Sequence, residues 1–479
     1  MNIRLVVNLM GKALIFLGLA MIFPLLWAVY DQGPDKMAFI YSIFITLISG
    51  FIVTLAVPQK GEIRYREGFA IVTFGWLLVS LYGCLPYLLS GVCSGFPEAF
   101  FETVSGFTTT GASIFTNVES LPRGILFWRS LTHWLGGMGI IVFLVALLSH
   151  LGVGANRIFR AEVPGVVTSK IMPRISETAK ILWVTYLLMT IMEVALLWFF
   201  GMPFFDALCH TFGTLATGGF SIKNKSIGAY DQASIQWVIT IFTFFSGANF
   251  ALYYQALRGR SLKAFWRNEE FRFYSVIVLV VTAIIAFNTR SFFGGTEELI
   301  RTAAFQVVSI ITTTGYATSD FNLWPYMSQA ILVMLMFVGG CSGSTSGSIK
   351  VGRILILMKQ AVLEIRKLIH PRAVFSLKIG GKNISNDLVS NVMQFFFLYV
   401  TIFSVSGIAM TAMGLDLKSA FTSVAATIGN VGPGLGIVGP AGNYSTIAGQ
   451  GKILLSFLML LGRLEIYTVF VMFSPSFWE

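Results

Sequence analysis

Four stretches of the sequence combine small or β-branched residues with a glycine in a pattern suited to binding a cation through backbone oxygens. The glycines are Gly111, Gly218, Gly315 and Gly432, and they recur at intervals of about a hundred residues, far longer than solenoid repeats. The residues before them are Thr109 and Thr110, Ala216 and Thr217, Thr313 and Thr314, and Asn430 and Val431. Glycine permits turns that other residues resist, so carbonyl groups can point toward a common axis. Rings of four carbonyl oxygens can replace the hydration shell of a potassium ion.

Each turn follows a short amphipathic segment that must position it. The segments read PEAFFETVSGFTTTGAS from Pro97, PFFDALCHTFGTLATGGFS from Pro203, EELIRTAAFQVVSIITTTGYATSD from Glu297 and DLKSAFTSVAATIGNVGPG from Asp416. Irregular backbone at membrane depth is tolerated only where it is buried in protein or lines a water-filled cavity. One instance is equally typical of an ordinary turn after a helix. Four spaced instances favour a cation filter made by four loops, with the negative ends of four helices directed toward the ion.

A run of small residues from Gly339 to Ser348 interrupts an apolar stretch. Such residues do not hold a stable helix against lipid, so we expect the run to divide a membrane span into two pieces. A phosphate-binding loop is disfavoured, because the G-x-x-x-x-G-K-[ST] spacing is absent. A structural kink packed by small residues remains an alternative.

Arg463 lies in the middle of the last apolar stretch. An arginine at that depth costs about 2.5 to 3.5 kcal/mol on insertion scales unless it faces a cavity or a partner. We expect it to face the ion pathway and to pair with Glu465 or with carbonyl groups of the 339–348 run. A helix-to-helix ion pair with no bearing on conduction is the alternative. Arg129, next to Trp128, is expected to be structural, since snorkelling at the outer surface explains it.

The composition excludes a water-exposed globule. Of the 479 residues, 55% are hydrophobic and 11% are charged, whereas soluble domains carry about 25% charged residues. The four cysteines and four histidines show no metal-ligand or disulfide spacing and are expected to be packing residues. Apolar runs predict ten membrane spans, at residues 7–30, 37–57, 68–90, 126–149, 179–201, 235–257, 274–289, 327–358, 389–413 and 452–473.

An even number of spans places both termini on one side. Most of the 33 Lys and Arg residues then fall in segments on that side, which the positive-inside rule assigns to the cytoplasm. The net charge of +11 is therefore topological, and nucleic-acid binding is excluded because the basic residues are spread over short loops. Glu102 and Asp206 belong to a net acidic outer face that raises the local concentration of cations, although ordinary solvated loop charge explains each of them equally well.

The sequence resembles the Trk/Ktr/HKT superfamily of potassium transport proteins, and within it the bacterial TrkH/TrkG type of membrane subunit. Besides the four turns, the resemblance rests on FWRSLTHWLGGMGI from Phe127, VGGCSGSTSGSIKVGR from Val338 and LGRLEIYTVF from Leu461. It covers the whole chain. In that superfamily one chain supplies all four filter glycines, and a glycine in the first loop, here Gly111, is typical of potassium-preferring members. The second and fourth loops, with Leu215 and Ala216 or Asn430 and Val431, follow the pattern more loosely.

The resemblance also implies a gate, an assembly and a location. The run near residue 340 resembles the intramembrane loop that blocks the pore in this family, which makes gate residues of Gly340, Gly343, Ser344, Thr345, Ser346, Gly347 and, in the last span, Arg463. Members work as homodimers in the bacterial inner membrane, surrounded by lipid. They bind a cytoplasmic nucleotide-binding regulatory subunit of the TrkA or KtrA type, for which the basic segments 157–174, 258–272 and 359–382 are candidate docking surfaces.

These observations predict an all-α polytopic membrane protein with ten transmembrane helices and four re-entrant pore helices in pseudo-fourfold span-loop-span repeats. The predicted divisions are two leading helices at 1–66 and pore repeats at 67–177, 178–272, 273–388 and 389–479. The predicted function is potassium uptake, with potassium held at the filter carbonyls, and not an enzymatic activity. A potassium transporter coupled to protons or sodium is the alternative, which would need inverted repeats and acids in the spans, where the sequence places only Glu193 and Glu465.

Overall fold

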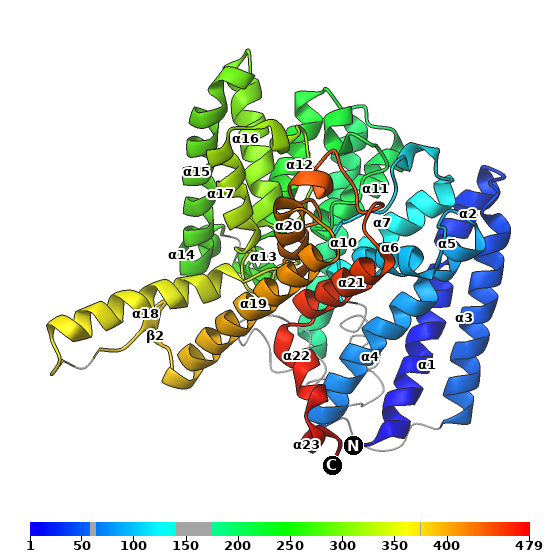
Figure 1. Ribbon diagram of the computed structural model, residues 1–479, viewed down its shortest axis with the longest axis horizontal. Helices are drawn as coiled ribbons and strands as arrows, with labels where there is room; N and C mark the ends of the chain where they lie inside the picture. The colour runs from blue at the N-terminus through cyan, green and yellow to red at the C-terminus, as the bar shows by residue number, and fades with distance from the viewer. Residues whose placement is uncertain (58–63, 140–174, 260, 374) are drawn as a thin grey trace.

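The computed structural model is mostly helical and describes residues 1–57, 64–139, 175–259, 261–373 and 375–479 (Figure 1). Within these residues, six helical segments are long and apolar enough to cross a membrane. They are α1 with α2 (Ile3–Ala20 and Ile22–Tyr30), α3 (Lys36–Ala56), α4 with α5 (Tyr65–Gly83 and Leu85–Leu89), α10 (Ile175–Phe199), α15 (Glu269–Thr289) and α19 (Asn386–Ala412). The chain is therefore a multi-pass membrane protein.

Two further pairs of helices are sharply bent. The axes of α12 (Ala233–Ser246) and α13 (Phe250–Gly259) differ by 94°, and those of α21 (Gly449–Arg463) and α22 (Ile466–Phe470) by 112°. Counting each pair as one span gives up to eight spans in the described residues.

The two remaining predicted spans are represented by shorter helices. α17 (Tyr326–Met336) and α18 (Val351–Ile369) are separated by the run of small residues, so the predicted division of that span is confirmed. α7 (Arg123–Gly137) covers the first part of the span predicted at 126–149, whose remainder lies outside the described residues. The total of ten membrane spans stays a prediction.

Four short helices lie within the bundle, at the positions where the sequence indicated amphipathic segments. They are α6 (Phe96–Phe107), α11 (Phe204–Leu215), α16 (Thr296–Ile311) and α20 (Leu417–Ile428). Their C-terminal halves are buried; for example, every residue from Ala99 to Phe107 of α6 is buried. Burial on all sides suits helices enclosed by other helices rather than by lipid.

The four short helices and four neighbouring helices contact one another in a closed ring. α6 packs against α7, α7 against α11, α11 against α12, and α12 against α16; α16 then packs against α17, α17 against α20, α20 against α21, and α21 returns to α6. Each short helix is thus held between the helix that follows it and the equivalent helix of the preceding unit. This arrangement brings the four short helices around one centre.

The remaining elements of the described chain are short helices, 3-10 turns and one small hairpin. These are α14 (Lys263–Arg267), α23 (Pro475–Trp478), the 3-10 turns at Val118–Ser120, Ser226–Ala229, Arg290–Phe292, Phe321–Leu323, Gly436–Val438 and Val471–Phe473, and the antiparallel strands β1 (Lys378–Ile379) and β2 (Lys382–Asn383), with Lys378 opposite Asn383. The two termini lie close together at one end of the molecule, while α18 and the β1–β2 hairpin extend from its side (Figure 1).

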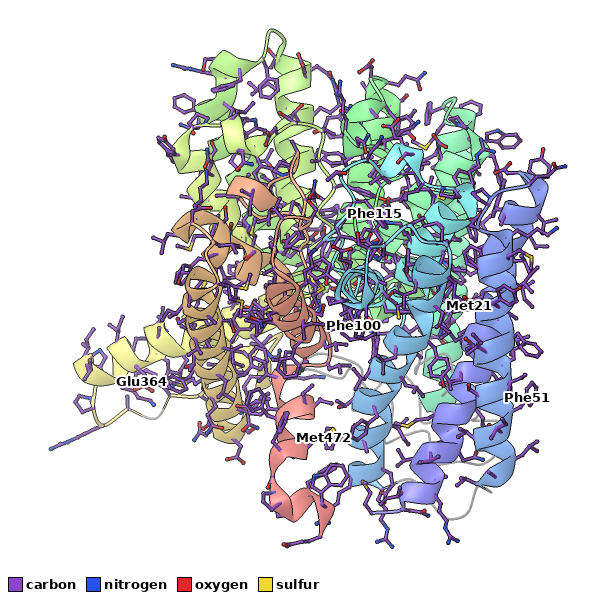
Figure 2. All side chains as sticks on the ribbon, turned by 45° about the vertical axis from the view of Figure 1, so that its right-hand side comes forward. Met21, Phe51, Phe100, Phe115, Glu364 and Met472 are labelled. Atoms are coloured by element: carbon purple, nitrogen blue, oxygen red, sulfur yellow. The ribbon has the colours of Figure 1, made fainter. Side chains whose placement is uncertain are left out.

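The outer surface of the bundle is apolar. On α3, Phe44, Phe51 and Leu55 expose 64%, 51% and 80% of their surface, and Phe51 lies at the outer edge of the bundle, whereas Glu364 lies on the projecting α18 (Figure 2). Large apolar side chains directed away from the protein need an apolar surrounding, and lipid supplies it.

Candidate functional site

The four short helices end in four loops with the same backbone conformation. We number them loop 1 (108–111), loop 2 (216–219), loop 3 (312–315) and loop 4 (429–432). The second residue of each loop has a left-handed backbone: Thr109 (φ 54°), Thr217 (φ 52°), Thr313 (φ 59°) and Asn430 (φ 52°). The N–H of the third residue donates to the carbonyl five residues earlier, at 2.9 Å for Thr110, 2.8 Å for Gly218, 2.8 Å for Thr314 and 2.7 Å for Val431. The loops are therefore structural equivalents.

The amino acids at these positions with a left-handed backbone are unusual. A helix commonly ends on a glycine in this conformation, whereas a β-branched residue such as Thr109, Thr217 or Thr313 is an outlier there. Strain of this kind persists only where the surroundings enforce it, and it is concentrated at functional sites. The loop conformation thus marks this centre as a candidate site on backbone evidence alone.

The structure corrects the register of loop 2. The glycines with positive φ are Gly111 (79°), Gly219 (78°), Gly315 (76°) and Gly432 (95°). The predicted equivalent, Gly218, instead occupies the position of Thr110, Thr314 and Val431, and Ala216 is the C-cap residue of α11. The prediction was wrong by one residue because Gly218 and Gly219 are adjacent, and composition does not distinguish which of two glycines adopts the turn.

The four loops close on one another. A side chain on Gly111 would overlap the carbonyl oxygen of Gly218, and one on Gly219 would overlap that of Thr314. In the same way, a side chain on Gly315 would overlap the Val431 oxygen, and one on Gly432 would overlap the Thr110 oxygen. Each loop therefore contacts the next and loop 4 returns to loop 1, so only glycine fits at these four positions.

This ring has the electrostatic character of a cation site. The C-termini of four helices meet there, and each carries a partial negative charge of about half an elementary charge. Peptide oxygens of the third residue of each loop, those of Thr110, Gly218, Thr314 and Val431, lie against the glycine of a neighbouring loop. A cavity of about 150 Å³ lies against the ring and is lined by one glycine from each loop, namely Gly111, Gly219, Gly315 and Gly432.

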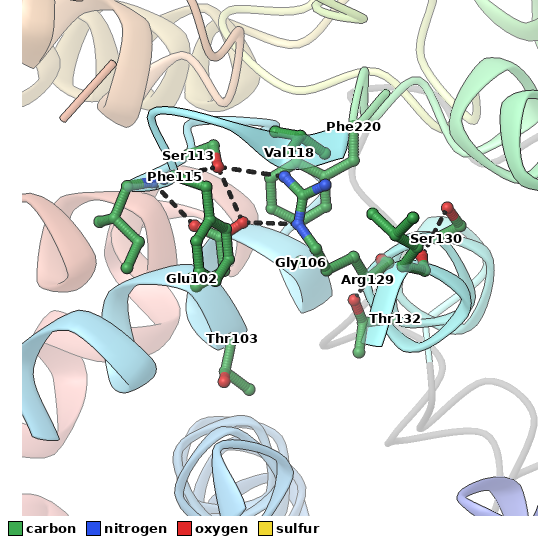
Figure 3. A network of polar contacts seen from close by, with 12 residues as sticks. Glu102, Thr103, Gly106, Ser113, Phe115, Val118, Arg129, Ser130, Thr132 and Phe220 are labelled. Carbon is green, nitrogen blue, oxygen red and sulfur yellow. Dashed lines mark hydrogen bonds and ion pairs between the residues drawn. The ribbon is translucent and has the colours of Figure 1, made fainter. Parts of the chain in front are cut away.

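A buried ion pair connects the segments that follow loops 1 and 2. The Arg129 Nε lies 2.8 Å from Glu102 Oε1, and both side chains are almost fully buried. Arg129 also donates to the Ser113 hydroxyl (3.1 Å), and its guanidinium lies 4.1 Å from the centre of the Phe220 ring (Figure 3). It donates further to the Ser221 carbonyl (3.0 Å). The prediction that Arg129 snorkels at the surface was wrong, and Glu102 is not a solvated loop charge.

The position of Glu102 is polar in the other short helices too. His210 of α11, Gln306 of α16 and Ser423 of α20 occupy it, each six residues before the helix cap. The His210 Nε2 lies 3.0 Å from the Ser221 hydroxyl, and the Gln306 amide donates to the Tyr316 carbonyl at 3.4 Å. Sequence reasoning missed this set, although aligning the four segments on their loops would have placed these polar residues in one column.

The glycine-rich loop (residues 339–348) lies directly against loops 2, 3 and 4. The Thr345 hydroxyl donates to the Leu215 carbonyl (3.0 Å), and the Gly347 N–H donates to the Thr313 hydroxyl (2.7 Å). A side chain on Gly347 would come too close to Gly429 and Asn430.

The other predicted residues of this loop make supporting contacts. The Gly340 carbonyl accepts from Val351, the Gly343 carbonyl from Phe250 (3.0 Å), and the Ser346 carbonyl from the Lys350 ammonium. The Ser344 hydroxyl donates to the Cys341 carbonyl at 2.6 Å. The run of small residues is therefore a compact loop packed against loops 2 to 4.

Arg463 ends α21 beside this loop. Its guanidinium donates to the carbonyls of Thr345 (2.7 Å), Gly136 (2.7 Å) and Gly137 (3.0 Å). The expected pairing with loop carbonyls is thus present. Glu465, the other expected partner, pairs with Arg353 at 2.6 Å. The chain bends sharply between the helices that Arg463 ends and Glu465 precedes.

The cysteines and histidines, which the sequence indicated as packing residues, can be placed as well. All four cysteines are buried and free, as expected for packing residues. His133 binds the backbone, with Nδ1 2.7 Å from the Gly106 oxygen and Nε2 accepting the Phe220 N–H at 3.0 Å. Among the described residues, no group of three His, Cys, Asp or Glu side chains could hold a metal ion.

The sequence profile of the TrkH family, described as a cation transport protein, matches residues 35–479 of the chain. The chain belongs to the TrkH family. The resemblance that the motifs predicted is confirmed.

Known members of the TrkH family match the chain end to end. It is 42% identical to the Trk system potassium uptake proteins TrkH of Salmonella typhimurium and of Escherichia coli K12, covering 100% of each chain. It is also similar to the crystal structure of the potassium transporter TrkH from Vibrio parahaemolyticus, with a TM-score of 0.90, 36% identity and 100% of both chains covered. These are names of transport proteins and not of enzymes.

Proposed function

We propose that this protein takes up potassium across the bacterial inner membrane through the ring formed by loops 1 to 4. The observation that carries the proposal is the closure of four equivalent loops, each bringing a helix C-terminus and peptide oxygens to one centre. The relatives named as potassium uptake proteins support potassium as the transported ion.

In this proposal the filter ligands are backbone carbonyl oxygens. The residues that supply them are Thr109 and Thr110, Thr217 and Gly218, Thr313 and Thr314, and Asn430 and Val431, with Gly111, Gly219, Gly315 and Gly432 permitting the turns. Potassium holds its hydration shell less tightly than sodium, so a ring of carbonyl dipoles replaces that shell at lower cost. The Glu102–Arg129 pair keeps loops 1 and 2 in register.

The glycine-rich loop and Arg463 form the gate. The loop fills the space beneath the ring, and a fixed guanidinium there repels a cation that has passed the filter. Conduction then requires the loop tip to leave its contacts with Leu215 and Thr313 and the Arg463 side chain to release Thr345.

A channel-like pathway accounts for the arrangement better than a single coupled site. The four loops have the same orientation around one centre. Glu102 is held by Arg129 and by the Ile114 N–H (2.9 Å), and Glu465 is paired with Arg353. These two acids are therefore poor proton relays, and Glu193, which is fully buried in α10, is the acid that the coupled alternative would use. The alternative, potassium transport coupled to protons or sodium, is decided by the experiment below.

The proposed assembly has ten spans with four re-entrant pore helices, cytoplasmic termini, two copies of the chain and a regulatory nucleotide-binding subunit of the TrkA or KtrA type. Its docking surface would include the basic segments 258–272 and 359–382. Segment 359–382 contains the hairpin and the projecting part of α18, which extend from the bundle (Figure 1). The third candidate segment, 157–174, lies outside the described residues.

Cation flux into proteoliposomes that contain the purified protein alone tests the proposal. Potassium and rubidium are expected to enter without a proton or sodium gradient. Gly315→Ser is expected to lower the preference for potassium over sodium, since a side chain there displaces the Val431 carbonyl, and Arg463→Ala is expected to raise flux. Saturable flux that requires an ion gradient and ignores both substitutions would instead establish a coupled transporter.

A further inference from the structure

One carboxylate joins the two ends of the glycine-rich loop. Glu270 lies in the first turn of α15, and its Oε1 accepts the N–H of Ser342 at 2.7 Å and the N–H of Gly352 at 2.9 Å. Ser342 lies near the start of the loop, and Gly352 lies just beyond its end, in the first turn of α18. No prediction from the sequence involved Glu270.

The contacts around Glu270 define a neck for the loop. The Gly339 N–H donates to the Ile349 carbonyl (2.8 Å), and the Val351 N–H donates to the Gly340 carbonyl (3.1 Å), so the entering and leaving strands lie side by side. A side chain on Gly352 would come within 2.7 Å of Glu270 Oε1, which shows how closely the carboxylate fits. The tip of the glycine-rich loop, from Thr345 to Gly347, by contrast contacts loops 2 to 4. A displacement of the tip must therefore pivot on the neck that Glu270 spans.

The bonds to Glu270 are of a strong kind. Hydrogen bonds to an ionised acceptor are about twice as strong as neutral ones. The carboxylate also lies at the N-terminus of α18, where unpaired N–H groups and the helix dipole favour a negative charge. Removing it leaves two backbone donors of the neck without this acceptor.

The preceding residue provides an internal comparison. Glu269 has the same charge and lies in the same helical turn, but it pairs with Lys359 of α18 and accepts the Gly380 N–H of the hairpin at 2.8 Å. Its contacts thus lie on the side away from the loop. The two adjacent carboxylates hold different structures.

We propose that Glu270 is a positioning residue of the gate, which fixes the neck of the glycine-rich loop and so keeps the tip against loops 2 to 4. The inference rests on the proposed function of that loop as the gate. In this proposal, part of the stability of the closed gate comes from Glu270, which contacts neither the ion nor the tip of the loop.

Cys341 offers a direct readout, because it lies beside Ser342 in the loop and exposes only 1% of its surface. In a protein with Cys84, Cys93 and Cys209 replaced by serine, we would measure the alkylation rate of Cys341 by a small maleimide. Loss of the carboxylate in Glu270→Ala is expected to raise this rate and the potassium flux about tenfold, since hydrogen bonds to charged groups are among the stronger ones. The potassium-to-sodium ratio should not change.

Glu269→Gln is the matched control and should leave Cys341 as protected as in the parent. Glu270→Gln keeps a neutral acceptor, is expected to fold even where Glu270→Ala does not, and should shift both readouts in the same direction by a smaller factor.

The outcomes separate this inference from the proposed function. If Arg463→Ala raises flux while both Glu270 variants keep parental flux and Cys341 protection, the neck assignment is wrong and the gate stands. If Arg463→Ala and the Glu270 variants all leave flux unchanged, the gate itself is wrong and the inference falls with it.

Discussion

At the residue scale, the left-handed threonines are the costliest feature of the site. Each departs from its preferred backbone conformation at a cost of about 1–3 kcal/mol. The hydroxyl of Thr217 contacts that of Thr345 (3.3 Å), and the hydroxyl of Thr313 accepts the Gly347 N–H. The glycine-rich loop therefore contributes to holding loops 2 and 3 in the conformation that makes the ring.

Gly219→Ala tests the corrected register of loop 2. A methyl group there overlaps the Thr314 carbonyl, and shifting a packed backbone group costs about 1–3 kcal/mol. We therefore expect a loss of potassium flux in proteoliposomes of about tenfold or more. Gly414→Ala is the matched control, because Gly414 has a similar φ of 96° but no atom within 4 Å of the added methyl. Equal loss in both variants would show that backbone strain alone, and not ring closure, sets the effect.

The Glu102–Arg129 pair should behave as a buried unit. Glu102→Ala leaves a buried guanidinium without its counter-charge and is expected to lower the free energy of unfolding by about 3–5 kcal/mol. The double variant Glu102→Met with Arg129→Met should recover much of that loss, because replacing both charges with apolar groups is often neutral. Thermal unfolding in detergent, followed by intrinsic fluorescence, measures both. Additive losses in the double variant would contradict the account.

Residue-level prediction from the sequence succeeded where a residue type has one physical use and failed where partners are distant. The four glycine turns are present and Arg463 lies beside the glycine-rich loop, whereas their roles in a filter and a gate stay predictions. Arg129 was misplaced because its partners, Glu102 and Ser221, come from other segments of the chain.

At the element scale, each short helix must start at a fixed point for its loop to reach the ring. α20 begins at Leu417, and its cap residue Asp416 accepts the Ser419 N–H at 3.1 Å. The hydroxyl and N–H of Ser419 hold the pKa of the Asp416 carboxyl below its usual range. A negative charge at this end also suits the helix dipole.

Asp416→Ala should therefore destabilise α20 by about 0.5–2 kcal/mol at neutral pH, as for other N-caps. Because folding depresses this pKa, the stabilisation is fully present above the ordinary aspartate pKa of about 3.9 and is lost as the pH falls through the lower folded value. The difference in unfolding temperature between parent and variant should thus narrow toward pH 3. Asp416→Ser keeps an acceptor and serves as the control. A difference that does not depend on pH would refute the capping role.

The elements themselves were largely predictable, and their ends were not. The break between α17 and α18 followed from ten small residues in a row. The bends of 94° and 112° were not predicted, although glycine and polar residues, Gly247 to Asn249 and Gly462 to Glu465, stand at the two breaks. The end of α11 at Leu215 was also missed, and this displaced the register of loop 2.

At the scale of the whole molecule, one chain builds a closed ring from four unequal units. In the described part of the chain, the buried Glu102–Arg129 pair belongs to the first unit and the glycine-rich loop to the third. This asymmetry means that the ring depends on contacts between units, such as that of Gly432 with the Thr110 carbonyl. The sequence period predicted the repetition, but the order of contact around the ring came only from the structure.

The central claim is that a dehydrated potassium ion binds at the centre of loops 1 to 4. Crystals grown in rubidium, which replaces potassium and scatters anomalously, test it most directly. We expect an anomalous peak enclosed by the carbonyls of Thr110, Gly218, Thr314 and Val431, which weakens when sodium replaces rubidium. An ion found at another site within the spans, with none inside the ring, would contradict the account.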